Sequence, residues 1–94
     1  MSYSFTVRAV SKSAALALVA VELAKVAEQQ PAHQADHAPA MQAAEAFVGA
    51  LPDDDTKDVT VTMCGSVTGV WQGLELQQLT GASVSVSAGL ATRA

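Results

Sequence analysis

Two histidines and an aspartate form the pattern closest to a metal site. His33 and His37 are four residues apart with Asp36 between them, and on a helix this spacing places both imidazoles on one side. A closed zinc site needs three or four ligands, so folding would have to bring in another, such as Cys64. Pro39 also argues against a regular helix through His33. We therefore predict solvated loop histidines, with metal binding as the alternative.

Four aspartates in the segment 53–58 invite a calcium interpretation. An EF-hand loop that began at Asp53 would need glycine at position 58 and glutamate at position 64. The sequence has Asp58 and Cys64 at those positions, so the motif is absent. We interpret the segment as a polar surface turn.

No set of residues predicts a reaction. Cys64 has no adjacent positive charge or helix start that would activate its thiol, and no helix follows Gly65, Gly69 or Gly73 to complete a phosphate cradle. We predict a protein without catalytic residues, cofactor or metal. An enzymatic or ligand-binding domain remains an alternative.

Three segments, 3–8, 59–64 and 83–87, alternate apolar residues with small hydroxyl residues. A period of two is typical of a half-buried strand. The outward side chains would be Ser4, Thr6, Arg8, Thr60, Thr62, Cys64, Ser66, Ser83, Ser85 and Ser87. Open sheets of monomeric proteins usually carry charges on such a face. The near absence of charge therefore predicts a contact surface, and the alternative is a solvated Ser/Thr face.

The first expected elements are a strand over 2–10 and a helix that is capped by Ser11 or Ser13 and ends near Gln30. A second helix follows from Asp36 to Leu51. Two further strands are expected over 59–71 and 82–90, joined by a connection over 72–81. This order predicts a single α+β domain over 1–94, β-α-α-β-β, in two layers. Two antiparallel helices would pack on one face of a three-stranded, mainly antiparallel sheet whose strand order stays open. The expected core is Phe5, Val7, Leu16, Val19, Leu23, Phe47, Leu51, Val59, Val61, Val84 and Val86.

Three apolar residues fall outside the predicted core pattern. Leu18 and Val21 lie nearly opposite the buried seam of the first helix, which suggests a second contact. Trp71 stands where the second strand ends, either as a cover for the core or as an interface anchor. The candidate interface is therefore Leu18, Val21, Thr60, Thr62, Trp71, Ser83, Ser85 and Ser87.

Composition excludes several classes of protein. Of 94 residues 50% are hydrophobic and only 15% charged, with a net charge of −4 and five scattered basic residues, so we expect no nucleic-acid binding. The apolar run 14–21 is shorter than the ~20 residues of a membrane span, so we expect no membrane partner. A single cysteine allows no intrachain disulfide, which favours a reducing compartment.

The segments SYSFTVRA, QQPAHQADHA and LTGASVSVSAGL resemble small uncharacterised proteins encoded by tailed bacteriophages and prophages. The resemblance implies either a virion accessory protein or a protein made early to redirect the host. It implies no catalytic residues.

We therefore expect a non-enzymatic phage interaction protein that forms homo-oligomers. It would serve as a virion accessory or capsid decoration subunit, bind other virion proteins, and occur in the host cytoplasm and in the virion. The alternative is a small inhibitor that binds a host regulatory or defence protein through the acidic segment 53–58.

Overall fold

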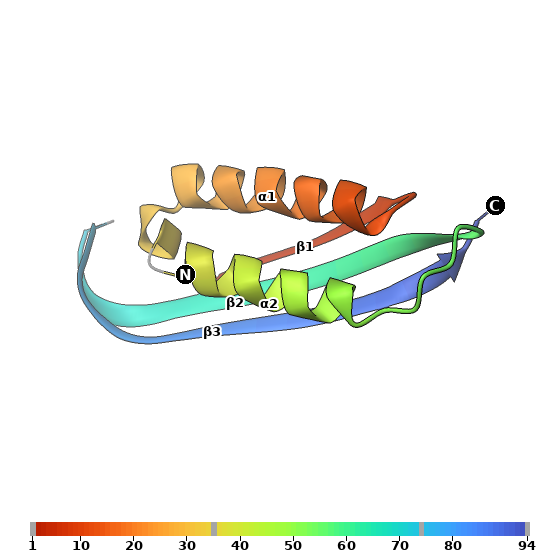
Figure 1. Ribbon diagram of the computed structural model, residues 1–94. Coiled ribbons are helices and arrows are strands. Elements are labelled where there is room, and N and C mark those ends of the chain that lie inside the picture. The colour runs from red at the N-terminus through yellow and green to blue at the C-terminus, as the bar shows by residue number, and fades with distance from the viewer. Residues whose placement is uncertain (1, 35, 74, 94) are drawn as a thin grey trace.

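The protein folds into two layers, a sheet and a pair of helices (Figure 1). The computed structural model describes residues 2–34, 36–73 and 75–93. Its elements are β1 (Ser2–Ala9), α1 (Lys12–Gln29), the 3-10 helix η1 (Pro31–Gln34), α2 (His37–Gly49), β2 (Lys57–Gln72) and β3 (Glu75–Thr92). The predicted α+β class and order of elements are confirmed.

The three strands form one antiparallel sheet in the order β1-β2-β3, which the sequence had left open. β1 pairs with residues 59–66 of β2, whereas β2 pairs with β3 from Lys57↔Thr92 to Gln72↔Glu75. The β2–β3 hairpin therefore continues beyond the end of β1, and Figure 1 shows this extension curving to one side.

The predicted connection over 72–81 is wrong, because β3 already begins at Glu75. The chain reverses next to Gly73, whose φ of +62° is in the left-handed region that favours glycine. Two register shifts then leave Thr80 and Gln77 of β3 without a direct partner in β2. Such bulges interrupt the period of two, which explains why this part of the strand looked like a loop. Leu74, which we had assigned to the connection, lies outside the described residues.

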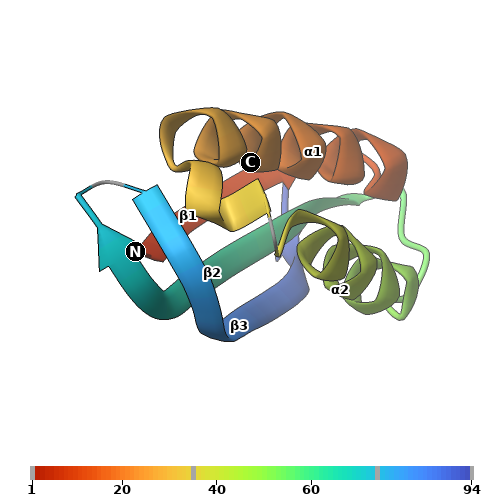
Figure 2. The ribbon, with the colours of Figure 1, turned by 90° about the vertical axis from the view of Figure 1, so that its left-hand side faces the viewer.

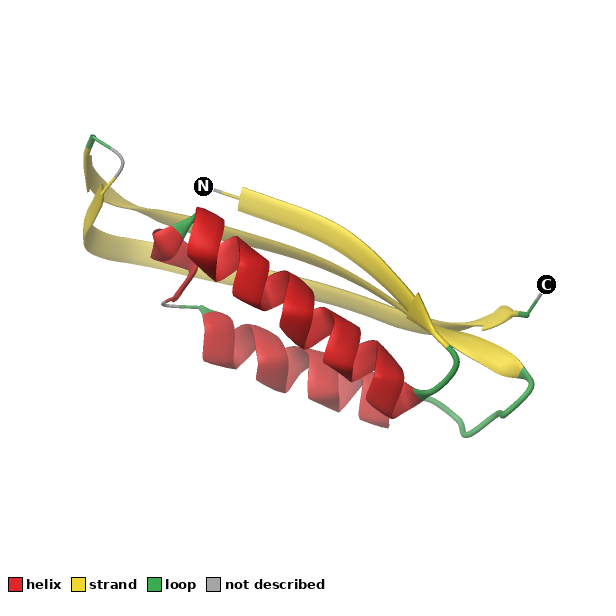
Figure 3. Ribbon diagram, turned by 90° about the horizontal axis from the view of Figure 1, so that it is seen from above, coloured by secondary structure: helices red, strands yellow, loops and turns green. Residues whose placement is uncertain are grey.

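Both helices begin directly after a residue that was predicted to cap them. The Ser11 hydroxyl accepts a hydrogen bond from the Ala14 N–H at 3.2 Å, so Ser11 rather than Ser13 caps α1. Asp36 is the N-cap residue of α2, but its side chain makes no capping bond. Figures 2 and 3 show α1 and α2 side by side on one face of the sheet. Within the described residues, no helix has the length and apolar character needed to span a bilayer.

The core lies between the sheet and the helix pair and consists mainly of small aliphatic residues. It comprises Tyr3, Val7, Ala15, Val19, Leu23, Ala40, Ala44, Val48, Val59, Val61 and Met63. The predicted core residues Val7, Val19, Leu23, Val59 and Val61 are confirmed, whereas others are only partly buried at its margin, namely Phe5, Leu16, Leu51, Val84 and Val86.

The prediction that Phe47 belongs to the core is wrong, because 52% of this residue is exposed. α2 buries Ala40, Ala44 and Val48 completely. These small side chains allow the helix to approach its neighbours closely. Phe47 lies beside the buried stripe and is left largely in solvent.

Tyr3 and Gly65 are direct cross-strand partners whose fit depends on the missing side chain of the glycine. A Cβ atom at position 65 would overlap the Tyr3 ring. The ring also stacks on Phe5, with 5.8 Å between the centroids. The absence of a side chain at Gly65 therefore makes room for a buried aromatic ring.

Gly65→Ala should lower the free energy of unfolding by about 1–3 kcal/mol, because the added methyl group forces the Tyr3 ring to move. The matched control is Gly89→Ala on β3, where the added Cβ would have its nearest neighbour, Thr60 Oγ1, at 3.9 Å. Urea denaturation measures both variants. Equal stability of the two variants would contradict this account of the Tyr3–Gly65 contact.

Candidate interaction surface

The outer face of the sheet, away from the helices, presents small hydroxyl side chains from three distant segments. The register sets Ser4, Cys64 and Ser85 in one row across the strands and Thr6, Thr62 and Ser87 in the next. We call this surface the hydroxyl face, with the members Ser4, Thr6, Arg8, Thr60, Thr62, Cys64, Ser66, Ser83, Ser85 and Ser87. The structure therefore brings together the predicted interface residues Thr60, Thr62, Ser83, Ser85 and Ser87.

Side chains of the hydroxyl face hydrogen-bond to one another across the strands. The hydroxyl oxygens of Thr6 and Thr62 are 3.1 Å apart, and those of Ser66 and Ser83 are 2.9 Å apart. The Cys64 thiol donates to the Ser4 hydroxyl at 3.5 Å. These bonds order the side chains and satisfy part of their hydrogen-bonding capacity within the protein. Removing water from the face therefore costs less than for unpaired hydroxyls.

Charge on this face is confined to one end and is largely neutralised there. Arg8 Nε donates to Asp58 Oδ2 at 2.8 Å, and Arg93 Nε donates to Asp58 Oδ1 at 2.9 Å. These two hydrogen bonds, that from Arg8 first, hold the pKa of Asp58 below its ordinary value. The stabilisation is present at neutral pH and is lost as the pH falls through that lowered pKa.

The other predicted interface residues lie elsewhere. Leu18 and Val21 are exposed by 42% and 51% on α1, on the opposite side of the sheet from the hydroxyl face. Trp71 lies on the hairpin extension beyond β1 and is half-buried, outside the main buried core. The predicted set is therefore not one continuous surface.

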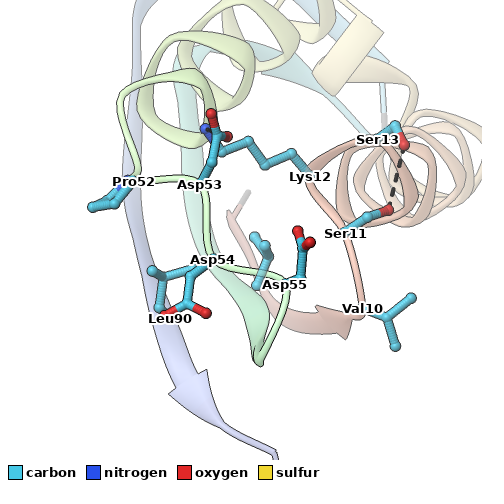
Figure 4. Close-up of a pocket in the computed structure, with 10 residues that line it drawn as sticks. Val10, Ser11, Lys12, Ser13, Pro52, Asp53, Asp54, Asp55 and Leu90 are labelled. Carbon is cyan, nitrogen blue, oxygen red and sulfur yellow. Dashed lines mark hydrogen bonds and ion pairs between the residues drawn. The ribbon is translucent and has the colours of Figure 1, made fainter.

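A cleft of about 350 Å³ separates the start of α1 from the acidic turn, and Figure 4 shows the residues that line it. Lys12 Nζ donates to the Leu51 carbonyl at 2.6 Å and pairs with Asp53 at 3.0 Å. Asp54 accepts hydrogen bonds from Thr56, which lower the pKa of its carboxyl group. Lys12, Asp53 and Asp54 thus bind other groups of the protein itself.

A buried polar cluster lies in the segment that joins α1 to α2. His33 is only 1% exposed, and its Nδ1 is 3.0 Å from Asp36 Oδ2. The His33 ring stands edge-on to Tyr3, with 4.8 Å between the centroids. The prediction that both histidines are solvated is wrong for His33, because the carboxylate that pairs with it allows its burial. The spacing of three between His33 and Asp36 was the signal for this pair.

The two histidines do not act together. His37 is the half-buried first residue of α2 and lines a shallow groove between the helices, whereas His33 is buried and paired with Asp36. Within residues 2–34, 36–73 and 75–93, no group of three or more His, Cys, Asp or Glu side chains is placed to hold a metal ion.

Tyr3→Phe should leave the free energy of unfolding unchanged or raise it by about 1 kcal/mol, because the Tyr3 hydroxyl is buried without a partner among the described residues. Burial raises the pKa of this hydroxyl from 10.0 to about 12, with a further contribution from Asp36. Below pH 10 the hydroxyl is protonated in both the folded and the unfolded chain. Between pH 10 and pH 12 only the unfolded chain ionises, so the free energy of unfolding falls as the pH rises through this range.

Tyr3 is the only tyrosine, so the absorbance of tyrosinate reports its titration alone. We expect the loss of stability between pH 10 and pH 12 to be smaller in Tyr3→Phe than in the parent chain. Titration of the folded protein near pH 10 would contradict the buried position of the hydroxyl.

No protein-family model, curated protein or solved structure matches the chain. The arrangement of its own side chains is therefore the basis on which its function is inferred.

Proposed function

We propose that the chain is a non-enzymatic protein that self-associates through its hydroxyl face. The observation that carries the proposal is the pairing of hydroxyls across the strands, Thr6 with Thr62 and Ser66 with Ser83. A face of small, mutually bonded side chains loses little rotamer freedom when another surface covers it. It also carries few charged groups whose bound water would have to be removed on contact.

The shape of the face supports contact with a second sheet. Its side chains are short, and sheets that stack face to face lie about 10 Å apart. Long charged side chains would hold two such faces further apart. Here the charged residues Arg8, Asp58 and Arg93 stand together at one end, which leaves the rows from Thr62 to Ser66 free of charge.

The buried cluster gives little support to an enzymatic function. Tyr3, His33 and Asp36 carry groups used in acid–base catalysis, yet they are only 8%, 1% and 3% exposed. A substrate would need access to these atoms. The cluster is better explained as part of the interior.

In the setting that the resemblance to phage proteins implies, a self-associating chain of this kind would be a virion accessory or decoration subunit. The inhibitor alternative relied on an acidic segment that could bind a basic partner. Three of its carboxylates, those of Asp53, Asp54 and Asp58, are already within ion-pair distance of lysine or arginine. This pairing favours the self-associating protein over the inhibitor.

Thr62→Lys tests the proposal at the centre of the hydroxyl face. Thr62 is exposed, and the variant removes its hydrogen bond to Thr6, so the free energy of unfolding should fall by no more than about 1 kcal/mol. A charge in the middle of the contact should abolish association through this face. The matched control is Gln42→Lys on the exposed side of α2, which adds the same charge elsewhere. Sedimentation velocity over a micromolar concentration series measures the oligomeric state.

We expect oligomers of the parent chain and of Gln42→Lys, and a lower average mass for Thr62→Lys, which loses association through the hydroxyl face. A parent chain that stays monomeric throughout the series would refute self-association. Oligomers of Thr62→Lys as stable as those of the parent would remove the hydroxyl face as the contact. A single host protein retained by a monomeric chain would instead favour the inhibitor.

A further inference from the structure

The outer edge of β3 is a second surface, distinct from the hydroxyl face. β3 lies at one end of the strand order and pairs only with β2 among the described strands. Figure 1 shows it running along the border of the sheet. In an edge strand, the N–H and C=O groups of alternate residues point away from the sheet. They form a template on which another strand can pair.

The two edges of the sheet differ in how far they discourage such pairing. β1 is short, Ser2–Ala9, and carries Arg8. β3 extends over Glu75–Thr92 and has neither a charged residue nor a proline from Gln77 to Thr92. Its pairing with β2 is regular from Gly81 to Thr92, without a bulge. Charge, proline and bulges are the features that keep edges apart, and this segment lacks all three.

The inner row of β3 is also incompletely covered. Val84, Val86 and Leu90 are only partly buried, whereas Val61 and Met63 of the central strand are fully buried. α2 packs mainly against β3, yet Val84, Val86 and Leu90 keep part of their surface exposed because β3 lies at the border of the sheet. A strand added beside β3 would cover this apolar row further.

We infer that β3 pairs antiparallel with β3 of a second copy of this chain, about a two-fold axis near Val86. This arrangement sets Val84 opposite Ala88 of the partner and Ser85 opposite Ser87 of the partner, so apolar residues meet apolar residues and hydroxyls meet hydroxyls. The contact is self-complementary, as a two-fold interface requires. A second copy also suits an edge that offers no charge by which another protein's segment would be recognised.

The inference rests on the proposed self-association and names a separate site for it. The regular segment Gly81–Thr92 is about 40 Å long at ~3.3 Å per residue. A strip ~10 Å wide would bury about 400 Å² per copy, or about 800 Å² in total, which is below the ~1,200 Å² of stable interfaces and typical of weak, transient ones. About ten backbone hydrogen bonds would accompany it. We therefore expect a dimer whose population depends on concentration in the micromolar range.

Amide hydrogen exchange of the unmodified chain, followed by NMR at low and high concentration, tests the inference. In the monomer, the outward amides of alternate residues between Gly81 and Thr92 should exchange rapidly. In the oligomer, the same amides should exchange at least about tenfold more slowly. The outward amides of β1 are the internal control, and their exchange should not change.

Three outcomes are distinguishable. Slow exchange at alternate β3 positions in the oligomer supports edge pairing. An oligomer whose outward β3 amides still exchange rapidly overturns the edge inference but leaves the proposed function intact. No oligomer at any concentration overturns both.

A proline substitution provides a second test. Val84→Pro and Ser85→Pro are the two candidate variants, and the exchange experiment decides between them. The variant to use is the one at the position whose amide exchanges rapidly in the monomer, because that amide donates no hydrogen bond to β2 and its loss leaves the sheet intact. This variant should keep its circular dichroism spectrum and raise the dissociation constant at least about tenfold. An unchanged dissociation constant in a folded variant overturns the inference.

Discussion

The contact between the Tyr3 ring and Gly65 is the constraint on which the rest of the structure depends. Side chains of a strand alternate between faces, so a shift of one residue between β1 and β2 would turn the apolar row outward and the hydroxyls into the core. The ring fits only where the partner strand has no side chain. A glycine that weakens a central strand in isolation therefore specifies the register that separates core from hydroxyl face.

The same ring connects the sheet to the segment between the helices. Tyr3 contacts His33, and His33 binds Asp36, the N-cap residue of α2. The Asp36 carboxylate thus fixes the η1 turn instead of capping the helix. The cluster leaves the Tyr3 hydroxyl and His33 Nε2 without partners among the described residues, at a cost of about 1 kcal/mol each, the low end of the usual range. We interpret this loss of stability as the consequence of a cluster that allows α2 to dock on the sheet in only one way.

The features that the sequence predicted are those that depend on regular periodicity. The alternation in residues 3–8 and 59–64 placed β1 and β2 correctly, and Ser11 marked the start of α1. The failures have local physical causes. Bulges at Gln77 and Thr80 hid the first part of β3.

Side-chain environments were harder to predict than elements. The burial of His33 depends on a carboxylate one turn away and on a ring from a distant strand, and the exposure of Phe47 depends on the tight packing of alanines beside it. For the candidate site, the composition of the hydroxyl face was predictable from the sequence. Its cross-strand hydrogen bonds and the open edge of β3 were not, because both follow from a strand order that the sequence left open.

The two proposed contacts have complementary strengths and weaknesses. The hydroxyl face carries few charges that must be dehydrated, but several of its side chains already bond to one another and offer few directional groups to a partner. The β3 edge offers a row of directional backbone groups but a small area. Pairing two edges would join two hydroxyl faces into one surface of six strands, which doubles the area available for stacking. Because each contact alone is weak, the extent of an assembly that needs both contacts would rise steeply with protein concentration. A chain of this kind would remain dispersed when dilute and assemble where its copies are gathered together.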